Sequence, residues 1–224
     1  MDNKLSLHLG KTEAILFGSK RKLKNINNFE VKCNDTTIKN VTSVKYLGLT
    51  LDNNISGESI VHNILKKASC RLKFLYRYSN ILNLKSRKTL CFALIQCHFD
   101  YACSSWYSGI NKGLKQRLQI MQNKMIRYIL NLDSRSHIGC PEFEKLNMLN
   151  VCDRVKQNKL NHVHKIWNGT GPQYMKEKFD RLCDTELKNC TRASANNFFL
   201  PLVKKQGINT FFLFWYQRLE FPSC

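Results

Sequence analysis

Acidic residues are scarce in this chain. Its 224 residues include 16 Asp and Glu against 36 Lys and Arg, a formal net charge of +20 at pH 7. A field of that sign attracts polyanions, of which nucleic acid phosphates are the commonest. The alternative is a basic protein whose charge serves solubility alone.

Signals of several other protein classes are also missing. No run of 18 or more apolar residues occurs, so no membrane-spanning helix is predicted, and the first ten residues form neither a signal nor a transit peptide. The ten cysteines include no C-x-x-C pair and no spacing typical of a metal site. We interpret them as reduced thiols of an intracellular protein, nuclear or cytosolic, without membrane partners.

The N-terminal quarter has the pattern of short strands. Apolar and polar residues alternate with period two over residues 29–33 and 37–41, and residues 44–52 form an extended segment that ends in a turn signal. The Lys/Asn-rich stretch 19–28 predicts an exposed turn. Residues 1–56 therefore predict a small antiparallel β meander.

Helical periodicity begins near Ser59. Helices are predicted from there to about residue 77, over 85–106 and 112–130, from Pro141 to Leu149, and over 153–167. The predicted core side of the second helix consists of Leu90, Ala93, Leu94, Cys97 and Tyr101. That of the third consists of Leu114, Leu118, Met121, Met125 and Ile129. The predicted fold class is α+β, with the β meander followed by a mostly α-helical bundle.

Two of these helices combine an apolar stripe with many cations. The first carries Lys66, Lys67, Arg71, Lys73 and Arg77, and the third carries Lys112, Lys115, Arg117, Lys124 and Arg127. Between Lys66 and Lys124 the only acidic residue is Asp100. Such helices can follow a nucleic acid backbone without reading its sequence. The alternative is a pair of ordinary solvated helix faces.

Residues 3–17, NKLSLHLGKTEAILF, and residues 44–52, VKYLGLTLD, form an ordered pair of motifs. The first resembles the NxLxLNxxKTxxMxF stretch that closes the palm of non-LTR retrotransposon reverse transcriptases of the jockey and CR1 type. The second resembles their VKYLGVxLD hairpin, the primer grip. Order and spacing also agree with the family.

The helical region continues the resemblance. Its segments resemble the family's AxxRLxxLxR, YAxxVW, LQxxQNKxxR and TR…LP…G…TF patterns, at residues 68–77, 101–106, 118–127 and 191–212. The resemblance thus implies a palm-end and primer-grip region at 1–56, a helical thumb-like bundle at 57–132, and a helical C-terminal region at 133–212.

The last residues, 213–224, depart from the family, which continues with a WNxLP segment. With one choice of codons from Phe212 onward, a shift by one base gives FYSGIKDWNSLP, the ending expected from the resemblance. Our hypothesis is a single-base frameshift that marks a decayed or mis-predicted copy. Sequencing the transcript across Phe212 tests it.

The resemblance implies a parent enzyme that copies RNA into DNA with Mg²⁺ and binds an RNA/DNA template-primer. Polymerisation needs carboxylates that converge on metal ions, yet no F/Y-x-D-D occurs here. We therefore expect a transposable-element fragment with no cofactor of its own. It would bind nucleic acid at most, and the missing upstream polymerase region would be a further partner. The alternative is an independent basic helical nucleic-acid-binding module without polymerase ancestry.

The resemblance also marks two sites in the β region. Lys11 lies where related polymerases place a lysine that protonates pyrophosphate or steadies the triphosphate; the alternative is a solvated lysine beside a strand. At Tyr46, Leu47 and Gly48, glycine allows an unusual backbone turn, so that an apolar tip can hold a primer sugar-phosphate. Alternatively, Tyr46 and Leu47 are core residues of a hairpin.

Overall fold

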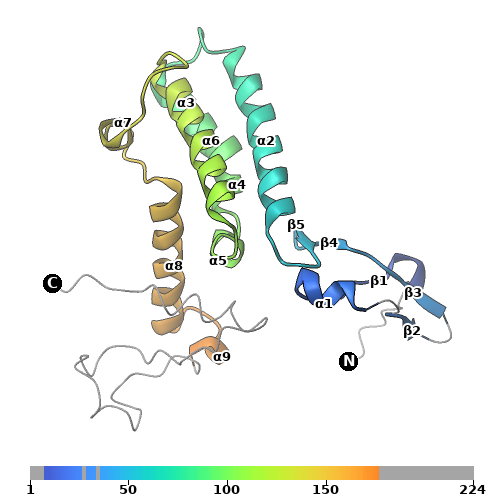
Figure 1. Ribbon diagram of the computed structural model, residues 1–224. Coiled ribbons are helices and arrows are strands. Elements are labelled where there is room, and N and C mark those ends of the chain that lie inside the picture. Colours follow the sequence, from blue (N-terminus) through green and yellow to red (C-terminus); the bar gives the residue numbers. More distant parts are fainter. Residues whose placement is uncertain (1–7, 27–28, 34–35, 177–224) are drawn as a thin grey trace. The chain divides into compact units, whose positions relative to one another are not determined.

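The computed structural model describes residues 8–26, 29–33 and 36–176, in which short strands precede a series of helices (Figure 1). The predicted α+β class is therefore confirmed. The chain divides into two compact units. Unit 1 comprises Met1–Phe99 with Gly109–Glu142, and unit 2 comprises Asp100–Ser108 with Phe143–Cys224.

Five short strands form two small sheets in unit 1. A three-stranded sheet has the order β1 (Glu13–Ala14), β3 (Thr36–Asn40), β2 (Val31–Cys33), and a hairpin pairs β4 (Ser43–Tyr46) with β5 (Leu49–Asp52). The pairs β2–β3 and β4–β5 are antiparallel, as predicted. The pair β1–β3 is parallel, which a pure meander does not contain. Two residues are too few to show an alternation from which this pairing could be predicted.

The stretch predicted as an exposed turn contains a short helix, α1 (Lys20–Lys24). The hydroxyl of Ser19 accepts a hydrogen bond from the amide of Lys22 and so caps the helix. The prediction of a turn was wrong there, because a good N-cap followed by lysine and arginine, which have high helix propensity, supports one helical turn. The basic side chains of α1 are exposed, as expected.

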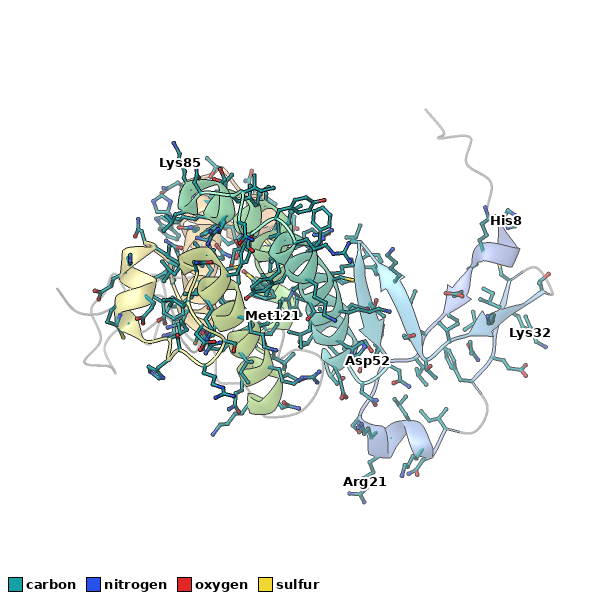
Figure 2. The ribbon with its side chains drawn as sticks, turned by 90° about the horizontal axis from the view of Figure 1, so that it is seen from above. His8, Arg21, Lys32, Asp52, Lys85 and Met121 are labelled. Carbon is teal, nitrogen blue, oxygen red and sulfur yellow. The ribbon has the colours of Figure 1, made fainter. Side chains whose placement is uncertain are left out.

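Two long helices, α2 (Glu58–Tyr76) and α6 (Lys112–Leu130), pack against each other in unit 1 (Figure 1). All five predicted core residues of α6 are buried, and Met121 lies among the densely packed side chains in Figure 2. Asn111 caps the start of α6 by accepting from the amide of Leu114, and Asn131 ends it at φ 55°. Each helix thus buries one apolar stripe and exposes the opposite face.

The single helix predicted over residues 85–106 is wrong. The structure has α3 (Leu84–Cys91), a π-helical segment η2 (Phe92–Gln96), α4 (Cys97–Asp100) and α5 (Cys103–Trp106), with Ala102 at φ 47° before α5.

The core side predicted for this stretch is wrong as well, since Ala93, Cys97 and Tyr101 are exposed and Leu90 and Leu94 are half-buried. The buried residues of this stretch are instead Cys91, Ile95, Gln96, Phe99, Cys103 and Trp106, of which Cys91, Ile95, Phe99 and Cys103 follow at intervals of four. A π turn has more residues than an α turn, so the buried stripe shifts away from the 3.6-residue period.

Unit 2 is built around α8 (Val151–Trp167), which contacts α5 and the short helix α9 (Gln173–Lys176). Asn150 caps α8 by accepting from the amide of Asp153, and the helix ends at Trp167, followed by Asn168 and Gly169, which agrees with the predicted end at residue 167. The helix opened by Pro141 is α7 (Cys140–Lys145). It ends before the predicted Leu149 because Asn147 turns the backbone at φ 47°.

Some predicted features lie outside the described residues: the first residues of the palm-end motif, residues 177–212 of the predicted helical C-terminal region with the whole 191–212 pattern, and the 213–224 tail. Among the residues that are described, none of the helices has the length and hydropathy needed to cross a membrane.

Candidate nucleic-acid interface

Helix α2 and its C-cap residue display a straight row of cations, which we call the α2 row and define as Lys66 and Lys73 of the helix and Arg77 at its C-cap. All three side chains are exposed. They are seven and four residues apart, so they lie on one side of the helix, opposite the buried stripe of Ile64, Ala68 and Leu75. Eleven residues correspond to roughly 16 Å along the helix axis. Three of the five cations predicted on this helix thus lie in one exposed row.

The surroundings of the α2 row are free of acidic residues in the sequence. From Ser59 to Phe99 the chain contains eight Lys and Arg residues and no Asp or Glu. An ordinary solvated helix surface usually mixes both signs, and the pairs stabilise it. Here the positive potential of the row is not offset by neighbours in the same stretch of chain.

Two predicted binding residues instead make internal hydrogen bonds. Arg71 is half-buried and donates to the carbonyl of Leu94, at 2.6 Å, and to Nε2 of His98. Arg127 is also half-buried and its Nε donates to the carbonyl of Ser136, at 2.8 Å. Neither arginine points outward with the α2 row, and both hold segments of unit 1 together.

Lys67 is exposed on the flank of α2, one residue away from the row. On α6, Arg117 and Lys124 are exposed and two turns apart on one side, while Lys115 is half-buried. Lys112 is exposed at the first turn of the same helix. The cations of α6 are therefore spread around the helix rather than gathered in a row.

The β4–β5 hairpin ends in a two-residue turn at Leu47 and Gly48. Both residues have positive φ, 45° and 80°, as a type I′ turn requires. Leu47 is 73% exposed and Tyr46 is 62% exposed. The alternative that these two are core residues is wrong. A leucine in the left-handed region costs roughly 1–2 kcal/mol, so this apolar tip does not serve hairpin stability.

Lys11 ends the 3-10 turn Leu9–Lys11 and its side chain is exposed. Its amide donates to the carbonyl of His8 at 3.0 Å, which closes the turn. Within the described ranges, no three or more His, Cys, Asp or Glu side chains are grouped so that they could hold a metal ion. Exposure of Lys11 agrees with the solvated-lysine alternative.

Arg87 is a structural residue that sequence reasoning missed. It donates from Nε to the carbonyl of Leu82 and from one terminal nitrogen to that of Ser79, both at 2.9 Å. Its guanidinium also lies 5.9 Å from the ring centre of Tyr128. The sequence shows Arg87 only as one more cation of a basic helix, and nothing in its local pattern distinguishes it.

Burial also lowers the reactivity of one thiol in unit 1. Cys91 is fully buried, and this burial raises the pKa of its thiol to about 12. A thiol with so little thiolate at neutral pH is a poor nucleophile. Cys70 lies exposed on α2, between Lys66 and Lys73.

Comparison of the chain with family models, with curated proteins and with solved structures gives no match.

Proposed function

We propose that this chain is the palm-end, primer-grip and thumb part of a non-LTR retrotransposon reverse transcriptase, without the catalytic aspartates, and that it binds template-primer nucleic acid. The ordered motifs at residues 3–17 and 44–52 support the ancestry. The α2 row carries the binding part of the proposal, because three outward cations in an acid-free stretch offer phosphates a continuous partner. The exposed tip at Leu47 supports a second contact, with the primer backbone.

Binding is tested by fluorescence anisotropy of the full chain with an RNA–DNA hybrid between about 50 and 200 mM salt. We expect a linear fall of log K with log salt, since each phosphate contact releases condensed counterions. The triple variant Lys66→Gln, Lys73→Gln, Arg77→Gln should bind more weakly and reduce the slope by roughly 3, about one per lost contact.

The matched control removes the same charge from exposed lysines of unit 2, as Lys145→Gln, Lys165→Gln and Lys176→Gln. Its slope should stay close to that of the unmodified chain. Equal losses in the two variants would mean that net charge alone attracts the hybrid. A salt response that is flat, or no binding, contradicts the binding proposal altogether.

The ancestry is tested separately, on genomic DNA. An F/Y-x-D-D encoded just upstream of the Met1 codon supports the reverse transcriptase origin. A unique promoter and conserved exon boundaries there favour the independent binding module instead. The two outcomes leave the binding experiment unchanged, because both origins use the same basic helices.

A further inference from the structure

Two aromatic side chains stand exposed where α2 ends. Phe74 is 50% exposed and Tyr78, two residues beyond the helix, is 45% exposed. Their ring centres are 5.2 Å apart and their planes are inclined by 57°. We call this pair the aromatic platform. The inclination leaves no parallel slot between the rings, so a flat ligand can stack only on an outward ring face.

The backbone beneath the aromatic platform is held by several bonds. The hydroxyl of Tyr128 donates to the carbonyl of Leu75 at 3.0 Å, and its ring meets that of Tyr76 edge-on at 4.9 Å. Arg87 fixes the carbonyls of Ser79 and Leu82 in the connection that follows. An ordered support reduces the conformational entropy that a ligand must otherwise remove on binding.

Cations flank the aromatic platform in the sequence. Lys73 and Arg77 of the α2 row are the sequence neighbours of its two rings, and both are exposed. Lys85 follows at the start of α3, where Figure 2 shows its side chain directed away from the helices. With no acidic residue between Ser59 and Phe99, the partner that fits this surface combines negative charge with flat apolar groups.

Unpaired nucleotides have this combination of features. Exposed aromatic faces beside a cationic path are the usual means of binding single strands, because every base has a π face and every phosphate a charge. Paired bases inside a duplex hide their faces, so a duplex gains nothing from the rings.

We propose that the aromatic platform stacks the bases of a single-stranded segment whose backbone continues along the α2 row. The proposal rests on the proposed nucleic acid binding and adds an unpaired strand as its ligand. An apolar protein partner is the competing occupant. An apolar partner would bury Lys73 and Arg77 without supplying acidic residues to pair with them. Removing an unpaired charge from water in this way is costly.

The first experiment needs only the unmodified full chain. Its affinity for an oligothymidine of about 12 nucleotides is compared with that for an abasic oligomer of equal length and charge. We expect the abasic strand to bind at least roughly fivefold more weakly, the loss that corresponds to one stacked base. Equal affinities would contradict the proposed base stacking and would favour a protein partner at this surface.

The second experiment uses the double variant Phe74→Ala, Tyr78→Ala. It should bind oligothymidine as weakly as the unmodified chain binds the abasic strand, and an RNA–DNA hybrid with unchanged affinity. The control Tyr174→Ala removes a ring that is 60% exposed in unit 2 and should change neither. Equal loss on single strand and hybrid overturns the platform, because stacking cannot explain it.

The two proposals fail in different ways. If the chain binds neither strand nor hybrid, nucleic acid binding and the platform are both wrong. If the hybrid binds and depends on the α2 row while oligothymidine and abasic strand remain equal, only the platform is wrong.

Discussion

At the residue scale, Arg71 is a cation whose hydrogen-bond partners lie within unit 1, and one of them is His98. An arginine can only donate, so Nε2 of His98 must accept, and it can do so only while the imidazole ring is neutral. Burial, together with the positive charges of Arg71 and Lys67, lowers the pKa of His98 below its usual value. The same contact joins α2 to α4 within unit 1.

This contact predicts that unit 1 loses stability in mild acid. The unfolded chain takes up a proton at His98 near the ordinary pKa of about 6.5, before the folded chain does. The contribution of the contact is therefore complete above that pH and lost as pH falls through the lowered pKa. We expect a loss of roughly 1 kcal/mol, the worth of one such hydrogen bond. Urea unfolding at pH 7.5, 6.5 and 5.5 measures it.

The variant His98→Gln keeps an oxygen that can accept from Arg71 but cannot titrate, so its stability should vary less over this range. His62→Gln, at an exposed position of α2, serves as the control and should keep the pH dependence of the unmodified chain. Identical profiles for all three proteins would show that His98 does not couple protonation to folding.

At the element scale, apolar periodicity predicted α2, α6 and α8 closely. Each has a stripe at helical spacing, and α6 and α8 begin at an asparagine whose side chain caps the first turn. The π segment η2 escaped prediction because its extra residue per turn is fixed by packing, not by local propensity. The partners of Arg71 and Arg87 escaped for a similar reason. They are backbone carbonyls and ring atoms that only the folded chain brings near.

The β4–β5 turn gives a prediction in which stability and binding change in opposite directions. Type I′ turns favour Asn-Gly, and Leu47 occupies the asparagine position in front of Gly48. Leu47→Asn should therefore raise the free energy of unfolding by roughly 0.5–1 kcal/mol. If the exposed tip holds a primer, the same variant should bind the RNA–DNA hybrid more weakly. Urea unfolding and anisotropy measure the two effects.

A suitable control is Lys45→Asn, at an exposed strand position of the same hairpin. Asparagine is disfavoured in strands, so this variant should lower stability instead of raising it. Destabilisation by Leu47→Asn would refute the idea that leucine is strained at this turn. Unchanged hybrid affinity would remove the hairpin tip from the binding surface.

At the scale of the whole molecule, the division into two units places all the features of the proposed binding surface in one of them. The α2 row, the aromatic platform and the hairpin tip all belong to unit 1. Unit 2 contains a bidentate ion pair, which we call the fork. In it, Arg154 donates from Nε and a terminal nitrogen to the two carboxylate oxygens of Asp100, at 3.2 and 3.0 Å. This pairing raises the pKa of Arg154 further above its ordinary value.

The fork predicts a local effect for Asp100→Asn. The pair is partly exposed, with 36% of the Arg154 side chain and 26% of the Asp100 side chain accessible, so its loss should cost about 0.5–1 kcal/mol. If the units open separately, hydrogen exchange should accelerate roughly two- to fivefold in α8 and stay unchanged in α2 and α6. Asp133→Asn removes the same charge from an exposed position of unit 1 and should leave α8 unaffected. Equal acceleration in all three helices after Asp100→Asn would instead show one cooperative fold, in which the proposed binding surface of unit 1 depends on the stability of unit 2.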